Sequence, residues 1–303
     1  MKKLKCVFIG FGKHAQKYGD VCRHLNIEIK AICVVNPNKY FHIKKKYFIE
    51  NIYSNHLEIL KKENYDFVMV FLPWDKIEKF IPNIIKNSKT LIFCEKPIAL
   101  SLNKILKINE LSKIYKRKVF VLYNRRLYKI FNFIKKILKK NKLLKFTMNI
   151  SEKEQELVKL HSNKIKGNLR YHITSHWLDL IMWLFNLNNL QIKRNEEIYN
   201  IKTHKKLDYY NVYLDYLGNR PIQMNFIFKN FRYKLITLEK LYMLKNNKKK
   251  IIFNEKKLNR FKPGILNVAK LIKKIVLNKT YKNDLPNTNN LVNLYRNLRY
   301  IIK

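Results

Sequence analysis

The chain has 303 residues, of which 47% are hydrophobic, so it can bury a full core and has the size at which one core usually divides into two domains. The first apolar run, residues 6–9, is shorter than the core of about 7–15 residues in a signal peptide. Lys or Asn interrupts every longer run before the ~20 apolar residues of a membrane-spanning helix, so we expect a soluble, cytoplasmic protein without a membrane span.

The formal net charge of +43 raises nucleic acid or an anionic membrane as a partner, because Lys and Arg displace counterions from phosphates. However, Lys, Asn, Ile, Tyr and Phe are abundant while Gly (6) and Pro (7) are scarce, which is typical of an AT-rich coding sequence. The cations are spread along the chain and Lys far outnumbers Arg, whereas proteins that read base edges favour Arg. We therefore expect no specific nucleic-acid partner, and we expect the remaining glycines to mark positions where the backbone requires them.

The first part of the chain alternates short apolar segments with longer segments of helical pattern. We predict strands at residues 4–9, 27–35, 67–72, 90–94 and 119–123. Near-continuous apolar runs suit strands that are covered on both faces, and their alternation with helices indicates a doubly wound parallel sheet. Ser54 and Ser101 are predicted to be helix N-caps.

The cysteines are confined to this part of the chain, at Cys6, Cys22, Cys33 and Cys94. They fall on predicted strands or on an apolar helix face, and no two of them have CxxC spacing. This distribution predicts buried free thiols in a reducing compartment rather than disulfides or a metal site.

After Tyr123 the pattern changes, and we place the domain border there: residues 1–123 form the first domain and residues 124–303 an α+β domain. A basic helical stretch at residues 125–142 leads into an apolar segment at 143–150, a polar loop and an amphipathic helix around residues 175–185. Apolar runs at 209–217 and 222–228 are separated by a Gly-Asn-Arg-Pro turn, which predicts a hairpin in a mainly antiparallel sheet. Two more helices, near residues 264–277 and 287–302, should close this domain.

The first predicted strand runs directly into Gly10-Phe11-Gly12-Lys13-His14-Ala15, a GxGxxA turn followed by a helical pattern. The first glycine permits a tight turn, the second lets the backbone approach a pyrophosphate, and the alanine allows the helix to pack closely on the strand. The amides and partial positive charge of the helix N-terminus suit phosphates. We therefore predict that Gly10, Phe11, Gly12, Lys13 and His14 bind a dinucleotide in a Rossmann domain.

The end of the second predicted strand bears on the choice between NAD and NADP. An acidic residue at this place accepts hydrogen bonds from the ribose of NAD, but this chain has Val34-Val35-Asn36-Pro37. Asn36 can hydrogen-bond a hydroxyl without repelling a 2′-phosphate, and Lys39 lies close enough in sequence to pair with one. Both NAD and NADP remain open on this evidence.

The fourth predicted strand is followed by Glu95-Lys96-Pro97, at the edge where doubly wound sheets bind ligands. With this motif, the GxGxxA turn, the strand that ends in Leu72-Pro73 and the segment at 167–186, the chain resembles the Gfo/Idh/MocA family, the relatives of glucose-fructose oxidoreductase and inositol dehydrogenase. The order of the four segments is more specific than any one of them. The resemblance implies an NAD(P)-dependent oxidoreductase whose cofactor site also contains Leu72, Pro73, Glu95 and Lys96.

The resemblance further implies which side chains act in the chemistry. Lys96 would point into the active site and polarise the oxygen whose charge changes during hydride transfer. His176 matches a histidine that donates or accepts the proton in many relatives, and the ordinary pKa of about 6.5 suits that role. His172, His176 and Asp179 can share one helix face and are predicted to contact the substrate, whereas this spacing is too common to predict a metal.

One departure from the family concerns His172, because relatives commonly carry an acidic residue at that position. The resemblance therefore also allows a protein that binds the cofactor without turnover, as a sensor or a scaffold.

The segment Tyr123-Asn124-Arg125-Arg126-Leu127-Tyr128 is similar to an Asn-Arg-Arg-aromatic segment in relatives involved in bacterial surface-carbohydrate synthesis. Asn124 and Arg125 can hold sugar hydroxyls or a diphosphate through forked hydrogen bonds, although a plain basic helix start is an equal alternative. The expected function is that of a sugar or nucleotide-sugar dehydrogenase. The resemblance also implies a possible homo-oligomer formed through the open face of the second sheet.

Overall fold

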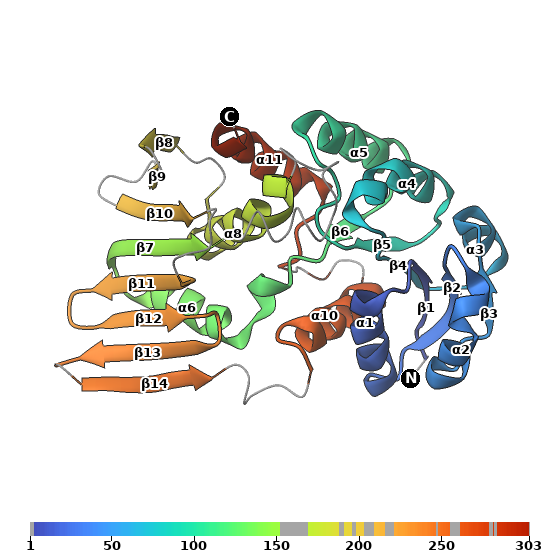
Figure 1. The fold of residues 1–303 in the computed structure, drawn as a ribbon, viewed down its shortest axis with the longest axis horizontal. Helices are drawn as coiled ribbons and strands as arrows, with labels where there is room; N and C mark the ends of the chain where they lie inside the picture. The colour runs from blue at the N-terminus through green and yellow to red at the C-terminus, as the bar shows by residue number, and fades with distance from the viewer. Residues whose placement is uncertain are drawn as a thin grey trace. The chain divides into compact units, whose positions relative to one another are not determined.

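In the computed structural model, the described residues are 3–151, 169–187, 191–195, 198–202, 209–215, 221–246, 248–254, 261–278, 281 and 284–302. The chain forms two compact units (Figure 1). The first contains Met1–Leu127 and Gly264–Val292, and the second contains Tyr128–Pro263 and Asn293–Lys303. The predicted polar loop after residue 151 and the Gly-Asn-Arg part of the predicted turn at 218–220 lie outside the described residues.

The first unit is built on a parallel sheet with the strand order β3-β2-β1-β4-β5-β6. Its strands are β1 (Lys5–Ile9), β2 (Glu28–Cys33), β3 (Asn51–Tyr53), β4 (Phe67–Val70), β5 (Leu91–Cys94) and β6 (Val119–Val121). The doubly wound parallel sheet predicted from the sequence is confirmed. The sequence analysis did not predict β3, because its three residues are exposed or half-buried and do not form an apolar run.

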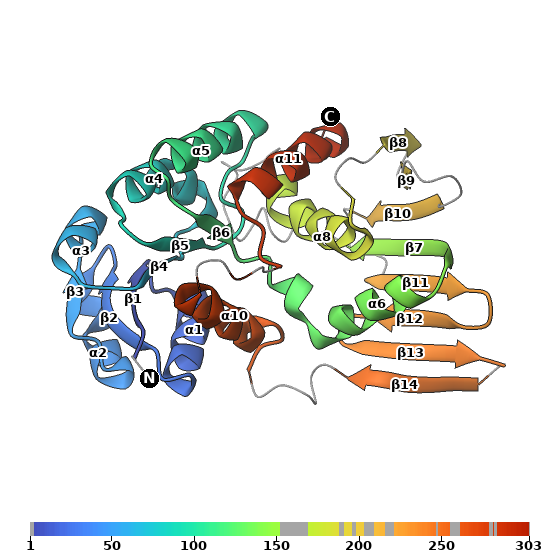
Figure 2. The same ribbon diagram turned by 180° about the vertical axis from the view of Figure 1, so that it is seen from behind.

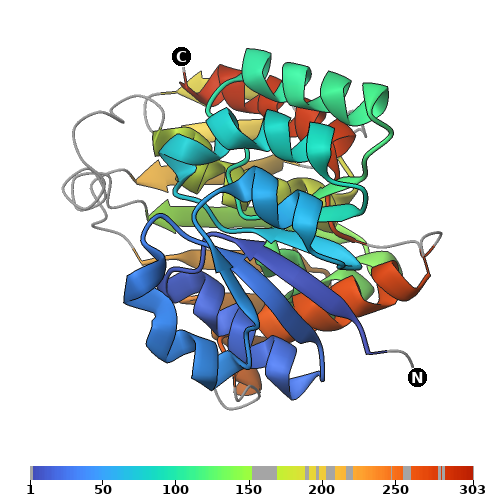
Figure 3. The ribbon, with the colours of Figure 1, turned by 90° about the vertical axis from the view of Figure 1, so that its right-hand side faces the viewer.

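Helices cover both faces of this sheet, as its fully buried central strands β4 and β5 require (Figure 3). One layer consists of α1 (Lys13–His24), α2 (Phe41–Tyr47) and α10 (Ile265–Leu277). The other consists of α3 (His56–Lys62), α4 (Trp74–Asn87) and α5 (Leu102–Ile114). Two 3₁₀ turns, η1 (Pro37–Tyr40) and η2 (Asn124–Leu127), follow the carboxyl ends of β2 and β6.

Of the two predicted N-caps, one is confirmed and one is wrong. The Ser101 hydroxyl accepts a hydrogen bond from the Lys104 amide at 3.3 Å at the start of α5. At the start of α3, however, the cap is Asn55, whose side-chain oxygen accepts from the Leu57 amide at 2.8 Å, and not Ser54. Asn and Ser cap equally well, so the side-chain type alone did not distinguish the two positions.

The four cysteines are free and buried, as predicted. Burial raises the pKa of the Cys33 thiol to about 11, and burial likewise raises the thiol pKa of Cys6 and Cys94 above the ordinary value. The thiols of Cys6, Cys33 and Cys94 therefore stay protonated, and they pack as small apolar groups in the first unit.

The chain returns to the first unit at residues 264–292, which the sequence analysis had assigned to the second domain. Helix α10 packs against α1, and Lys273 donates a hydrogen bond to the Leu25 carbonyl at 3.2 Å. Farther on, the Val121 amide donates to the Pro286 carbonyl at 2.8 Å, so this segment covers the outer edge of β6. An apolar helix face indicates that the helix packs against another element, but it does not indicate which element. The sequence therefore did not reveal that residues 264–292 belong to the first unit.

The second unit contains a mixed sheet with the strand order β14-β13-β12-β11-β7-β10-β9-β8. Its strands are β7 (Leu143–Ser151), β8 (Gln191–Asn195), β9 (Ile198–Lys202), β10 (Tyr209–Asp215), β11 (Gln223–Phe228), β12 (Arg232–Ile236), β13 (Lys240–Lys245) and β14 (Lys248–Asn254). Every neighbouring pair is antiparallel except β7 and β10. The mainly antiparallel sheet is therefore confirmed.

The predicted hairpin between the runs at 209–217 and 222–228 is wrong. Strands β10 and β11 run in opposite directions but do not pair, because β7 lies between them, with Met148 opposite Val212 on one side and Met224 on the other. A turn signal shows that the chain reverses, whereas pairing also depends on which strand buries the most apolar surface. Strand β7 has nine residues with Phe146, Met148 and Ile150 buried.

Among the described residues, three helices contribute to the second unit: α6 (Lys129–Lys140), α8 (Leu169–Phe185) and the last part of α11 (Thr288–Ile302). Helices α6 and α8 contact each other and lie on the same face of the sheet (Figure 2). The ring of Phe185 lies 5.0 Å from that of Phe146, and the ring of Phe133 lies 5.7 Å from that of Tyr233. These contacts form the core of the unit.

Helix α8 begins six residues before the predicted start, at residue 169 rather than 175. Among the helices in the described ranges, none is both long and apolar enough to cross a membrane.

Candidate cofactor and active site

The turn after β1 is held by its contacts with both neighbouring strands. The Gly10 amide donates a hydrogen bond to the Cys33 carbonyl of β2 at 2.8 Å, and the Phe71 amide donates to the Ile9 carbonyl at 2.8 Å. Gly10 has a φ of 85°, in the left-handed region that favours glycine. A β-carbon there would overlap the Phe71 carbonyl oxygen, so residue 10 has to be glycine for both reasons.

Gly12 is needed for a different reason, because its φ of −70° suits any residue. It is the N-cap of α1, and a β-carbon built on it would meet no atom within 4 Å. The first intrahelical hydrogen bond is donated by the Gln16 amide to the Gly12 carbonyl at 3.0 Å, so the amides of Lys13, His14 and Ala15 precede it. With no side-chain cap and no acidic residue in its first turn, this end of α1 suits a phosphate.

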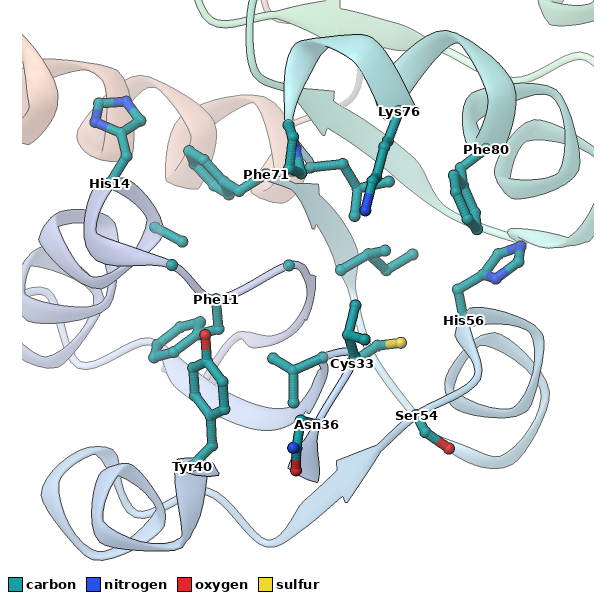
Figure 4. Close-up of a pocket in the computed structure, with 18 of the residues that line it drawn as sticks. Phe11, His14, Cys33, Asn36, Tyr40, Ser54, His56, Phe71, Lys76 and Phe80 are labelled. Atoms are coloured by element: carbon teal, nitrogen blue, oxygen red, sulfur yellow. The ribbon is translucent and has the colours of Figure 1, made fainter. Parts of the chain in front are cut away.

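A cavity of about 690 Å³ opens over this turn, at the carboxyl edge of the sheet (Figure 4). The predicted cofactor residues that line it are Gly10, Phe11, Gly12, His14, Asn36, Leu72, Pro73 and Glu95. Lys13 and Lys96 are not among the lining residues. The volume, the glycine turn and the open space over Gly12 fit a dinucleotide, and binding by each individual residue stays a prediction.

One end of the cavity is formed by residues after β2, β3 and β4, several of which the sequence analysis did not select. Besides Lys39, which the sequence analysis considered for a 2′-phosphate, these lining residues are Cys33, Val34, Val35, Tyr40, Ser54, His56, Lys76 and Phe80. Ser54 and His56 became visible only through β3, because they reach the cavity where β3 pairs with β2. Without that strand, nothing in the sequence indicates that they share a site with Gly10.

His56 and Phe80 form the wall at this end of the cavity (Figure 4). Their rings meet edge to face at a centroid distance of 5.1 Å. Burial lowers the pKa of His56 below the ordinary value, so its imidazole is neutral at neutral pH. The His56 Nε2 atom is buried without a hydrogen-bond partner among the described residues, so this wall has a polar atom to offer a ligand.

The opposite end of the cavity lies where β5 ends. The Glu95 amide donates a hydrogen bond to the Val70 carbonyl at 2.9 Å, which holds the start of the Glu-Lys-Pro segment against β4. Glu95 Oε2 lies 3.3 Å from His14 Nε2, in the first turn of α1. Lys96 follows directly and is half-buried.

Strand β6 lies beside β5, with Val121 opposite Cys94. The two segments that follow these strands, with Lys96 in one and Asn124 and Arg125 in the other, therefore begin at the same edge of the sheet. Asn124 is buried with 9% of its surface exposed, and Arg125 is half-buried. The prediction that all three contact a substrate is compatible with this placement and remains untested.

The remaining predicted site residues lie on α8 in the second unit. His176 and Asp179 are buried, with 9% and 2% of their surfaces exposed, and His172 is half-buried. The four-residue and three-residue spacings put all three on one side of the helix. In the part of the chain that the structure describes, no group of three or more His, Cys, Asp or Glu side chains is arranged to hold a metal ion.

The parallel sheet, the glycine turn and the cavity are those of a dinucleotide-binding Rossmann domain. Residues 4–123 match the model of the Gfo/Idh/MocA family, which is described as an oxidoreductase family with an NAD-binding Rossmann fold. This match covers residues 4–123 and agrees with the resemblance found in the sequence. A sequence comparison with curated proteins finds no match.

Solved structures match nearly the whole chain. The dehydrogenase MviM from Clostridium difficile has a TM-score of 0.82 and 17% identity, covering 99% of each chain. An oxidoreductase from Agrobacterium radiobacter, in complex with NAD+, L-tartaric acid and magnesium, has a TM-score of 0.74 and 14% identity over 98% of this chain and 95% of that one. A myo-inositol 2-dehydrogenase from Lactobacillus plantarum has a TM-score of 0.74 and 14% identity, covering 97% and 94%.

At these identities the structures show a common fold. The match of residues 4–123 to a family model described as NAD-binding confirms the predicted nicotinamide cofactor.

Proposed function

We propose that this protein is a cytoplasmic NAD(P)-dependent dehydrogenase that acts on a sugar or nucleotide-sugar, in the synthesis of surface polysaccharide. The observation that carries the proposal is the cavity at the carboxyl edge of the first sheet, where the glycine turn and Glu95 line one space and Lys96 follows at its end. A dinucleotide with its pyrophosphate over Gly12 has its two ends on either side of that turn. The end of β5 is then the place for the reacting group.

The proposed roles of His176 and Lys96 follow from the proton and the negative charge that accompany hydride transfer. A bound nicotinamide cofactor would supply the chemistry of hydride transfer between a carbinol carbon and a carbonyl carbon. In the oxidising direction the hydroxyl also loses its proton, which His176 accepts, and the carbinol becomes a carbonyl. The Lys96 ammonium donates a hydrogen bond to the same oxygen and stabilises the negative charge that develops on it.

Two observations support a polyhydroxylated substrate. Asn124 and the guanidinium of Arg125 follow the strand beside Lys96, and forked donors of this kind suit sugar hydroxyls and the diphosphate of a nucleotide-sugar. Among the solved relatives, one is named for myo-inositol and another holds L-tartaric acid, and both compounds carry several oxygen functions.

The test is turnover of a panel of sugars and UDP- or GDP-sugars by the full-length protein, followed as formation or consumption of NADH and NADPH. We expect turnover with at least one nucleotide-sugar, and we expect Lys96→Ala and His176→Ala each to lower kcat by about 10²–10⁴-fold. His176→Ala should keep the affinity of the wild-type protein for the dinucleotide within about threefold, because His176 is not among the predicted cofactor residues. Lys104→Ala, on the exposed surface of α5, is the matched control and should keep full activity.

A second candidate function is dinucleotide binding without turnover, as in a sensor or scaffold. The observation that favours it is His172, which stands where relatives commonly carry an acidic residue. Tight cofactor binding with no turnover of any sugar, nucleotide-sugar or polyol would replace the dehydrogenase proposal with this one. Formation of a homo-oligomer through the second sheet belongs to either proposal, and sedimentation of the purified protein tests it.

A further inference from the structure

The cavity has more positively charged than negatively charged side chains among its described lining residues. Among the described lining residues the carboxylate is Glu95, at the end of β5, and it lies 3.3 Å from His14. Two lysines also line the cavity: Lys39 comes from η1, after β2, and Lys76 from α4, after β4. Figure 4 shows the ammonium of Lys76 directed into the cavity, on the side opposite Asn36.

These two lysines differ from several others in the same unit. Lys30, Lys46 and Lys62 each lie against a carboxylate of Glu50, Asp20 and Glu58, respectively. By contrast, neither Lys39 nor Lys76 forms an ion pair with any described carboxylate. Their charges are therefore available to an anionic ligand in the cavity.

The backbone after β2 leaves the side chain of Asn36 available as well. The turn is closed by the Lys39 amide, which donates a hydrogen bond to the Asn36 carbonyl at 3.3 Å. Asn36 is the N-cap of η1, but its side chain makes no capping hydrogen bond. The amide group and the Lys39 ammonium therefore project from one short turn at the rim of the cavity, three residues apart.

From these observations we propose that the protein uses NADP(H) in preference to NAD(H), and that Lys39 and Asn36 are the residues that determine this specificity. The proposal rests on the proposed function, because it assigns the adenosine half of the dinucleotide to the end of the cavity after β2. A carboxylate at residue 36 would accept hydrogen bonds from the ribose diol and repel a 2′-phosphate. The neutral Asn36 donates to the phosphate instead, and Lys39 pairs with its charge.

The decisive measurement is equilibrium binding of NADPH and NADH to the full-length protein, by calorimetry or by quenching of aromatic fluorescence. We expect NADPH to bind at least about tenfold more tightly than NADH. Adenosine 2′,5′-bisphosphate should compete with NADPH more strongly than 5′-AMP does, and inorganic phosphate should not compete at millimolar concentration. This pair of fragments separates recognition of a 2′-phosphate on the ribose from attraction of any phosphate to a basic protein.

Variants locate the effect in the turn after β2. Lys39→Ala should weaken NADPH binding about tenfold and change NADH binding less than about twofold, and Asn36→Asp should reverse the preference between the two cofactors. Lys45→Ala is the matched control, because Lys45 is exposed on α2 nearby and does not line the cavity. Thermal unfolding of each variant shows whether it is folded, and the NADH affinity of Lys39→Ala provides a second check.

Equal or tighter binding of NADH by the wild-type protein would overturn the proposal and leave the proposed function standing. A loss of NADPH affinity in Lys45→Ala as large as that in Lys39→Ala would also overturn the proposal, because the loss would then result from the lower net charge of the protein. If neither dinucleotide binds, the proposed function itself fails together with this inference.

Discussion

Gly10 lies against Phe71 so closely that a β-carbon on residue 10 would stand 2.8 Å from the Phe71 carbonyl carbon. The turn cannot move away, because the Phe71 amide donates a hydrogen bond to the Ile9 carbonyl at 2.8 Å. Gly10→Ala adds this overlap to the strain of a φ of 85°. We expect it to lower the free energy of unfolding by about 1–3 kcal/mol or more, measured by chemical denaturation.

Gly12→Ala is the matched variant two residues away. A methyl group there meets no atom of the protein within 4 Å, so we expect the free energy of unfolding to fall by about 1 kcal/mol or less. The same methyl group enters the space over α1, and the affinity for both NADH and NADPH should fall about tenfold or more. Unchanged affinity in a folded Gly12→Ala protein would show that the pyrophosphate lies elsewhere.

Cys33 combines a buried thiol with a place in the cavity wall. Burial raises its pKa to about 11, so at pH 8 only about one molecule in 10³ carries the reactive thiolate. We expect slow alkylation of the native protein by iodoacetamide, at Cys33 before the other cysteines, and further protection by saturating NADPH. Mass spectrometry of digested protein measures this, with Cys33→Ser as the control. If saturating NADPH does not change the rate at which Cys33 is alkylated, the nucleotide does not bind beside Cys33.

The neutral imidazole of His56 predicts a contribution to stability that depends on pH. Burial lowers its pKa in the folded protein, whereas in the unfolded chain the pKa is about 6.5. The unfolded chain thus binds the proton first as the pH falls. The contribution is complete above about pH 6.5 and is lost as the pH falls from there through the pKa of the folded state.

We therefore expect the free energy of unfolding to fall less between pH 7.5 and pH 5.5 in His56→Gln than in the wild-type protein. His42→Gln, on the exposed surface of α2, should retain the pH dependence of the wild-type protein. Identical pH dependence of the free energy of unfolding in His56→Gln and in the wild-type protein would show that His56 does not cause this dependence.

Helix α3 provides a test of which residue caps it. Asn55→Ala removes the hydrogen bond from the Leu57 amide and should cost about 1 kcal/mol of stability. Ser54→Ala, one residue earlier, removes no cap and should change stability by less than about 0.5 kcal/mol. An equal loss in both variants would contradict the assignment of the cap to Asn55.

Much of the first unit followed from local sequence. The GxGxxA turn predicted the loop at Gly10 and Gly12, and eight of the predicted cofactor residues line one cavity. Local sequence did not reveal β3, and for that reason it did not bring Ser54 and His56 to the same cavity. A three-residue strand with partly exposed side chains has no period that distinguishes it from a loop.

The sequence by itself determined the class of the protein, because glycine turns, apolar strands and a Glu-Lys-Pro segment act through the backbone and the order of the chain. Only the tertiary structure decided which strands, helices and side chains lie next to one another. It placed β7 between β10 and β11, returned α10 to α1, and brought Lys39, Lys76 and Glu95 into the wall of one cavity. Such contacts depend on which apolar surfaces and charges meet across long stretches of chain, and no local pattern records that.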